Sequence, residues 1–322
     1  MKTIKSIFLT LALSTTGITA QAAESTSISA PKQVAGYYHH QIGNTQITAL
    51  LDGTNYLNPA LFKGLNETQK IEILKKYAAV NDKGIQTSVN AFLINTGKQL
   101  LMIDSGAASC FGTHLGSIYN NLKASGYKPT QVNGIFLTHL HPDHVCGIAN
   151  NGVANYPNAN LHISKTEYNY WLNPNTVKKL PKDKQIGFLA TVEKIKAALA
   201  PYEAAKKIKL FSDKSLRFGD VEFKPSFGHT PGHYSFKLKA DGQDVVFIGD
   251  IVHSHSLQFE KPETAIEFDI DPQAAIQTRL QHFAQYAQDG QLIAAPHLPF
   301  PGLGYIYKHG VSYQWMPLHF KD

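Results

Sequence analysis

The amino-acid sequence predicts an α/β sandwich in which helices cover the outer faces of β-sheets. Strand and helix patterns alternate in both halves of the chain, and this alternation is typical of α/β folds. In addition, two β-hairpins each end in a short apolar strand that leads to an aspartate, Asp104 in the first half and Asp250 in the second. This echo indicates a β-rich unit that occurs twice.

Short apolar runs bounded by turn residues mark the strands. In each half, two such runs form a hairpin across a turn that contains glycine. The strand candidates are residues 47–52, 89–95, 100–103, 134–137, 234–238, 245–248 and 292–295.

Helical spacing of apolar residues and capping signals place the helices between these strands. Ser164 and Glu167 form a capping-box pattern at the start of one helix. Asp271 and Pro272 suit the N-cap and the first turn of another. The predicted helices span about residues 66–80, 113–125, 164–171, 185–200 and 271–288.

Composition excludes several classes of protein. The chain has 322 residues, of which 43% are hydrophobic and 17% charged, so it can bury a core and is unlike disordered or collagen-like chains. Its formal net charge is +6, but Arg217 and Arg279 are its only arginines. Because bidentate contacts to phosphates and bases favour arginine, nucleic acid is not expected as a partner. No low-complexity linker divides the chain, which favours one domain from about residue 35 to the end.

Residues 1–22 have the pattern of a secretory signal peptide. A basic start and a short apolar run precede small residues around Ala22. We therefore expect an exported protein, periplasmic or secreted, with no membrane anchor after cleavage. Residues of about 23–45 are expected to form an N-terminal arm in which His39 and His40 are solvated.

Export would place both cysteines in an oxidising compartment. Cys110 and Cys146 are then expected either to pair as a disulfide or to remain two small buried thiols. The sequence alone leaves both alternatives open.

The positions of the histidines carry the functional signal. An apolar strand run ends just before His139, His141, Asp143 and His144. His139 and His141 are two positions apart, so an extended backbone points both side chains to one side. Pro142 then turns the chain, which lets Asp143 and His144 face back. This spacing is typical of metal ligands, and a coincidental surface cluster is the alternative.

Three further candidate ligands lie in a tight loop or at strand ends. His229 precedes a strand, whereas Asp250 and His297 each follow an apolar strand. Nitrogen and carboxylate ligands without thiolate suit zinc, or manganese, iron or cobalt, as divalent ions. Five histidines and two aspartates are too many for one tetrahedral ion, so they predict two ions that share a bridge. His233, in the same loop as His229, is expected to be structural.

These motifs resemble those of the metallo-β-lactamase superfamily over most of the chain. The resemblance implies that residues 23–322 form a single αββα sandwich with a dinuclear metal site at one edge of the sheets. It also implies the ligand sets: His139, His141 and His229 for one ion, Asp143, His144 and His297 for the other, and Asp250 as the bridge. The zinc β-lactamases depart from this pattern, because one subclass has cysteine at the position of Asp250 and another lacks the bridging aspartate. β-Lactamase activity is therefore not expected.

Within the superfamily, the sequence is most similar to exported hydrolases of the methyl parathion hydrolase type and to related quorum-quenching lactonases. The phrases that carry this similarity are residues 89–97, 249–253 and 297–302. Acyl-homoserine lactonases have a tyrosine three positions after the bridging aspartate, where this chain has His253. This difference disfavours acyl-homoserine lactones as the main substrate. His253 is expected to donate a hydrogen bond to substrate or to orient Asp250.

The expected reaction is metal-dependent hydrolysis of small apolar lactones and activated aryl esters, with organophosphate triesters as promiscuous substrates. A hydroxide held between two divalent ions would attack the carbonyl or phosphoryl centre, and Asp143 would move a proton to the leaving group. No Gly-x-Ser-x-Gly nucleophile motif occurs in the chain. Four aromatic residues are predicted to form the pocket wall: Phe92, Trp171, Phe188 and Phe300.

Other functions stay open at this point. A phosphodiesterase or a glyoxalase-type thioester hydrolase uses a similar ligand set. A non-catalytic exported protein that stores or senses zinc is a third class. The sequence is also compatible with a homodimer.

Overall fold

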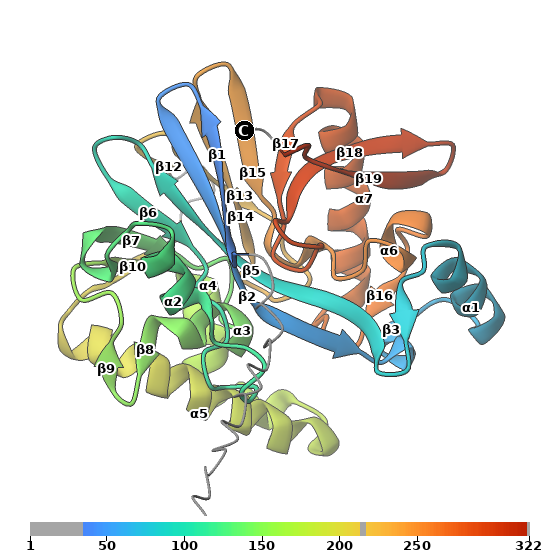
Figure 1. The fold of residues 1–322 in the computed structure, drawn as a ribbon. Helices are drawn as coiled ribbons and strands as arrows, with labels where there is room; N and C mark the ends of the chain where they lie inside the picture. The colour runs from blue at the N-terminus through green and yellow to red at the C-terminus, as the bar shows by residue number, and fades with distance from the viewer. Residues whose placement is uncertain (1–34, 213–216, 321–322) are drawn as a thin grey trace, which may run out of the picture. The chain divides into compact units, whose positions relative to one another are not determined.

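Two β-sheets lie face to face, and helices cover the outer face of each (Figure 1). The computed structural model describes residues 35–212 and 217–320, and these belong to one compact unit. The expected signal peptide, residues 1–22, lies outside the described residues, as does the arm up to residue 34. The layered arrangement confirms the expected αββα sandwich.

The first sheet has the strand order β1-β2-β5-β6-β7-β10-β11, with β4 beside β5. Its strands are β1 (Tyr37–Ile42), β2 (Thr45–Leu57), β4 (Val80–Asn81), β5 (Gly84–Asn95), β6 (Leu100–Ile103), β7 (Val132–Phe136), β10 (Asn160–Ser164) and β11 (Ile208–Phe211). Because β6, β7 and β10 pair in parallel, their C-terminal ends lie at the same edge. The expectation of an N-terminal arm with solvated histidines is therefore wrong in part: β1 pairs with β2 in the sheet, and His40 is buried.

The second sheet has the strand order β12-β13-β14-β15-β17-β18-β19. Its strands are β12 (Arg217–Phe218), β13 (Val221–Pro225), β14 (Tyr234–Ala240), β15 (Gln243–Phe247), β17 (Leu292–Ala294), β18 (Leu303–His309) and β19 (Ser312–Pro317). Strands β15 and β17 pair in parallel, so the segments that follow them leave the sheet at one edge. Two short pairs complete the strands: β3 (Phe62–Lys63) with β16 (Ala265–Ile266), and β8 (Ala149–Asn150) with β9 (Val153–Ala154).

The helices form the outer layers. They are α1 (Glu67–Lys76), α2 (Ile118–Ala124), α3 (Pro142–Val145), α4 (Lys165–Leu172), α5 (Lys182–Ala204), α6 (Leu257–Glu260) and α7 (Pro272–Asp289). Short 3-10 turns are η1 (Pro59–Leu61), η2 (Pro129–Gln131), η3 (Cys146–Ile148), η4 (Val177–Lys179) and η5 (Gly249–Ile251). In the part of the chain that the structure describes, no helix combines the length and the hydropathy needed to span a bilayer.

Alternating residues of the central strands face two different cores, as the two-residue period of a strand requires. In β15, Val245 and Phe247 pack between the sheets, whereas Val246 packs in the cluster that includes Phe283 of α7. In the first sheet, the outward-facing residues pack with residues of α2 and α5, such as Leu199. Both sheets are thus buried on two faces, so a functional site is expected at an edge of the sheets, where the loops that follow the strands lie.

The helix predicted over residues 113–125 is shorter than expected. It begins only at Ile118, because Gly116 has a left-handed backbone with φ 99°, which does not continue a helix. Gly116 also lies close to Ala108, since a Cβ atom at Gly116 would be 2.9 Å from the carbonyl oxygen of Ala108. The preceding residues form a turn-rich loop that includes Cys110. Cys110 and Cys146 form a disulfide, so of the two alternatives for the cysteines the pair is the one found.

Candidate metal centre

The seven predicted ligands meet at the edge where strands of both sheets end. His139 and His141 follow β7, and α3 begins directly after His141, which turns Asp143 and His144 back toward this edge. His229 lies in the loop between β13 and β14, Asp250 in η5 after β15, and His297 after β17.

Asp250 lies at the centre of the cluster. Its Oδ2 atom is 3.2 Å from His229 Nε2 and 3.5 Å from His139 Nε2. Its Oδ1 atom is 3.2 Å from His144 Nε2, and His297 Nε2 lies 3.2 Å from both oxygens. Asp250 Oδ2 therefore faces His139 and His229, Asp250 Oδ1 faces His144, and His297 lies between the two oxygens.

Potential ligand atoms form groups in which all atoms lie within 4.8 Å of one another. One group is His139, His141, His229 and Asp250, and another is Asp143, His144 and His297. We call these the first and second ligand sets. They match the sets that the family resemblance implied, with Asp250 placed between them. A third group joins Asp250, His253 and His297.

Unpaired polar atoms test whether this cluster fits metal ions. His139 Nε2, His144 Nε2 and Asp250 Oδ1 are buried and form no hydrogen bond, although they lie 3.2–3.5 Å from charged or ionisable atoms of the same cluster. Buried polar atoms without partners are costly and rare in native proteins. Three such atoms facing one centre, all of them nitrogen or carboxylate donors, fit divalent ions such as zinc.

Outer partners hold three of the histidines, His144, His229 and His297, with Nε2 toward the centre. Asp104 Oδ2 lies 2.9 Å from His144 Nδ1, and Asp269 Oδ1 lies 2.9 Å from His229 Nδ1. The carbonyl oxygen of Ser88 is 3.1 Å from Nδ1 of His297. Such contacts fix the ring orientation and the tautomer of a metal-binding histidine.

Burial and neighbouring charges set the protonation of the cluster. Burial lowers the pKa of His139 and His141 well below the usual histidine value, so both rings are neutral. Burial also opposes a charge on His144, but Asp250 and other carboxylates outweigh it and raise its pKa well above the usual value. For Asp250, burial opposes ionisation, and the surrounding imidazoles, His144 first, hold its pKa well below the usual range. Asp250 is thus a buried carboxylate.

The other two histidines of the prediction have different roles. His253 Nε2 lies 3.1 Å from Asp250 Oδ2, and its ring stacks on His297 at 5.0 Å between centroids. Burial lowers the pKa of His253 to about 4, which keeps it neutral. His233 accepts a hydrogen bond from the backbone N–H of Asp250 at 2.9 Å. This contact lets His233 support the backbone of Asp250. The left-handed Gly249 makes room for it, because a Cβ there would lie 2.4 Å from His233 Nε2.

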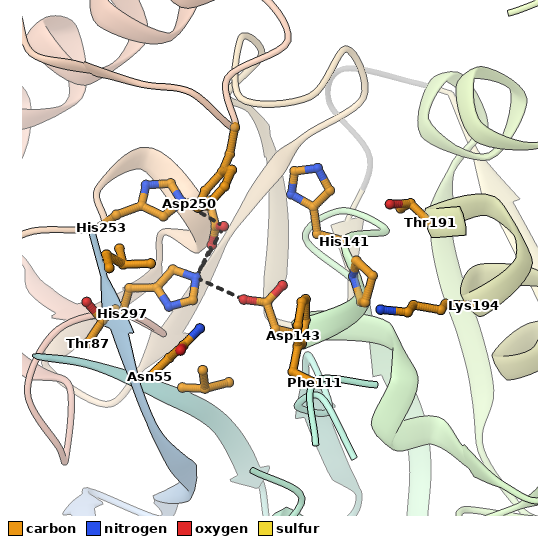
Figure 2. Close-up of a pocket in the computed structure, with 14 residues that line it drawn as sticks. Asn55, Thr87, Phe111, His141, Asp143, Thr191, Lys194, Asp250, His253 and His297 are labelled. Atoms are coloured by element: carbon orange, nitrogen blue, oxygen red, sulfur yellow. Dashed lines mark hydrogen bonds and ion pairs between the residues drawn. The ribbon is translucent and has the colours of Figure 1, made fainter. Parts of the chain in front are cut away.

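A cavity of about 280 Å³ opens beside the ligands. In Figure 2, His253 and His297 lie on one side of this cavity, and His141 and Lys194 on the other. The apolar part of its lining comes from Leu57, Val89, Phe111 and Phe268. The polar part comes from Asn55, Thr87, Thr191 and Lys194, together with members of the metal centre.

The four aromatic residues predicted as the pocket wall do not line this cavity, and that prediction is corrected. Phe92 faces the core between the sheets, 5.5 Å from Phe247 between ring centroids. Trp171 and Phe188 stack on each other at 4.9 Å in the core under α4 and α5, and Phe300 packs at the rim of the inter-sheet core. Strand and helix positions bury Phe92, Trp171 and Phe188, and Phe300 is half-buried in the loop between β17 and β18, whereas other loops present Phe111 and Phe268 to the cavity.

Two buried charged residues support the centre but were not among the predicted site residues. Arg279 of α7 donates hydrogen bonds to three carbonyl oxygens in the segment after Asp250, those of Ile251, Pro262 and Thr264. Glu167 was interpreted only as part of a capping box. Ser164 does cap α4, but the Glu167 carboxylate turns to the metal-centre loops instead of the helix start.

Fold and site together define a metal-dependent hydrolase built on an αββα sandwich. The family model of the metallo-β-lactamase superfamily matches residues 84–298, and this chain belongs to that superfamily. The expected family is thereby confirmed. A comparison with curated protein sequences finds no match.

Several solved structures are similar to this chain. AbOPH, a hydrolase in the β-lactamase superfamily, is 60% identical, with a TM-score of 0.89 over 90% of this chain and 100% of that chain. AidC, a dizinc quorum-quenching lactonase in complex with a product, N-hexanoyl-L-homoserine, is 25% identical, with a TM-score of 0.79 over 89% of this chain and 99% of that chain. A probable metal-dependent hydrolase from Staphylococcus aureus, at 19% identity and a TM-score of 0.68 over 88% and 100% of the two chains, shares the fold.

Proposed function

We propose that this protein is a dinuclear metal hydrolase that opens lactones and cleaves activated aryl esters, with organophosphate triesters as secondary substrates. The observation that carries the proposal is the position of Asp250 between two ligand sets, beside a partly apolar cavity. The similarity to AidC, which is a dizinc lactonase, supports both the reaction class and zinc as the metal.

The ligand sets assign the ions to residues. His139, His141 and His229 would hold one ion and Asp143, His144 and His297 the other, with Asp250 shared. When bound, such ions supply Lewis acidity for a carbonyl or phosphoryl oxygen and lower the pKa of water at the site.

Asp143 and His253 are the side chains placed to act on the substrate. Asp143 is 23% exposed at its side chain and lines the cavity, so it can hold a proton and deliver it to the leaving oxygen. His253 also lines the cavity, while its Nε2 faces Asp250. This contact favours the orientation of Asp250 as its main role.

The cavity lining supports an uncharged, partly apolar substrate. Phe111 and Phe268 are 40% and 41% exposed, so they offer ring surface to an acyl or aryl group. Lys194 is the only lysine or arginine among the lining residues, and its ammonium group already donates to the carbonyl oxygen of Cys110 at 2.9 Å. Charge-assisted contacts to a phosphodiester anion favour arginine and lysine, so this lining supports an uncharged substrate better than a phosphodiester.

We also propose that the protein acts outside the cytoplasm after cleavage near Ala22. The Cys110–Cys146 disulfide supports this location, because stable disulfides are typical of oxidising compartments.

Metal removal and replacement of Asp250 test the proposed function together. Chelation should abolish turnover of a lactone and an aryl ester, and zinc should restore it. Asp250→Asn should lower kcat/KM by at least about a hundredfold, since it weakens the ligand shared by both sets. His309→Ala is the control substitution, because His309 is an exposed residue at the end of β18 and belongs to neither ligand set.

The result also separates catalysis from metal storage. Metal content should be measured in the same preparation as hydrolysis of lactones, aryl esters and phosphotriesters. Stoichiometric metal without turnover of any of these substrates would contradict the proposal and favour storage. Full turnover in the Asp250 variant would contradict the proposal in another way, because catalysis would then not depend on the shared ligand.

A further inference from the structure

The carboxylate of Glu167 joins the two loops that carry the histidines of the first ligand set. Its Oε1 atom accepts a hydrogen bond of 3.0 Å from the backbone N–H of Leu140. Its Oε2 atom accepts from Thr230 Oγ1 at 2.7 Å and from the backbone N–H of Gly232 at 3.0 Å. Leu140 lies between His139 and His141, and Thr230 directly follows His229.

A fourth hydrogen bond connects Glu167 to Trp171, whose indole ring packs against His141. Trp171 donates its Nε1 hydrogen to Glu167 Oε1 at 2.7 Å, and the indole packs edge-on against His141 at 5.4 Å between centroids. Glu167 therefore contacts both sides of the first ligand set while binding no ligand atom itself.

Burial makes these four contacts important. Glu167 is 1% exposed, and a buried carboxylate is costly unless donors satisfy it. Burial raises the pKa of Glu167, and the hydrogen bonds from the two loops oppose that rise. All four partners are donors, so the site is built for the ionised form.

The loop of His229 also lies directly against the start of α4. A Cβ atom at Gly232 would lie 2.2 Å from the backbone nitrogen of Glu167. This close approach is independent of the hydrogen bonds, and it places the loop where Glu167 can hold it. In the second ligand set, Asp143 and His144 belong to α3 and His297 follows β17. Within residues 35–212 and 217–320, the carboxylate that contacts both of these segments is the shared ligand Asp250 itself.

We propose that Glu167 is a positioning residue that sets the spacing of His139 and His141 relative to His229, and so controls metal affinity at the first ligand set but not at the second. The inference rests on the proposed metal binding and not on the proposed substrate. Its test therefore measures zinc affinity rather than turnover.

Glu167→Gln is the informative substitution. The glutamine keeps the size of the side chain, but its amide nitrogen cannot accept the hydrogen bonds that one carboxylate oxygen accepts now. Either Leu140 and Trp171 or Gly232 and Thr230 would then face a donor. One loop should be released, and loss of such an outer partner typically weakens metal binding tenfold to a hundredfold.

The experiment is a competition titration of the metal-free protein with zinc and a chromophoric chelator. Glu167→Gln should weaken binding of one zinc equivalent at least tenfold and leave the other within about threefold. Tyr168→Phe is the matched control on the same helix. It removes the 2.8 Å hydrogen bond to Glu203 of α5 without touching either loop, and it should leave both affinities unchanged.

Two backgrounds assign the weakened ion to its ligand set. In His297→Ala only the first set is intact, so adding Glu167→Gln should weaken zinc binding at least tenfold. In His141→Ala only the second set is intact, and the same addition should change zinc binding less than threefold. Equal weakening in both backgrounds, or none in either, would overturn the inference.

A milder substitution guards against loss of folding. Should Glu167→Gln fail to fold in thermal unfolding of the metal-free protein, Thr230→Val removes one donor and keeps the carboxylate. It should weaken the first set severalfold and spare the second. An unchanged pair of affinities in that variant would count equally against the proposal.

Discussion

Removal of the Cys110–Cys146 disulfide is expected to destabilise the fold by a few kcal/mol and to loosen one wall of the cavity. The bond closes a loop with a sequence separation of 36 residues. In the chain-entropy treatment, a loop of that length stabilises by roughly 3.8 kcal/mol at 25 °C. The disulfide also ties the cavity wall to the metal centre. Phe111, which directly follows Cys110, lines the cavity, and Cys146 lies two residues after His144.

Cys110→Ala/Cys146→Ala is the cleanest perturbation, because Cys146 is 3% exposed and alanine introduces no buried hydroxyl. Urea unfolding of the metal-free protein measures the loss without a contribution from metal binding. For a urea m-value of ~3 kcal/mol/M, the midpoint should fall by about 1.3 M. Wild-type protein treated with a phosphine reductant should match the variant, and the reductant should leave the variant unchanged.

The catalytic consequence should be smaller than the loss of stability. Lys194 donates to the carbonyl oxygen of Cys110 at 2.9 Å and lies 4.8 Å from the centroid of the Phe111 ring, so the loop keeps a second anchor. The KM of an apolar substrate should rise severalfold while kcat stays within about twofold, since Phe111 belongs to neither ligand set. A loss of less than about 1 kcal/mol in the free energy of unfolding would refute the entropic reasoning. A large fall in kcat would show that the disulfide loop affects the chemical step and not only substrate binding.

Two further predictions concern specificity and acid stability. Phe268→Ala should raise KM for a long-chain lactone by about fivefold, because roughly 1 kcal/mol of apolar contact is lost. The KM for a short-chain lactone should change little, and an equal effect on both substrates would argue against a role of Phe268 in chain binding. Hydrogen bonds from Lys224 and then Lys239 lower the pKa of Glu222 to about 2 from an ordinary 4.5, so its stabilising effect is present above pH 4.5 and disappears as the pH falls toward 2. Glu222→Gln should therefore lower the Tm of the metal-free protein at pH 7 and converge with the wild type near pH 2, and a constant difference in Tm across that range would disprove the assignment.

The ligand residues were accessible from the sequence because local geometry places them. His139 and His141 are two residues apart at the end of a strand, and Pro142 starts the helix that turns Asp143 back. These relations depend on neighbours in the chain, so a pattern of residue types reveals them.

The pocket wall was predicted wrongly for the opposite reason. Trp171 and Phe188 are aromatic residues of helices, and their side chains point into the core because α4 and α5 pack there. Phe111 and Phe268 line the cavity from loops, and their position depends on a disulfide and on packing between segments far apart in the chain. Aromatic character alone does not distinguish these two environments.

By itself, the sequence determined the fold class, the family and the residue types that gather at the sheet edge, because strand periodicity, helix caps and metal-ligand spacing are local. Tertiary structure decided how that edge is held. Glu167 meets Leu140 and Gly232 across 27 and 65 residues of chain, and Asp269 meets His229 across 40. A carboxylate serves as a solvated surface group or as a buried acceptor depending on which distant donors surround it, and only the packed chain brings those donors together.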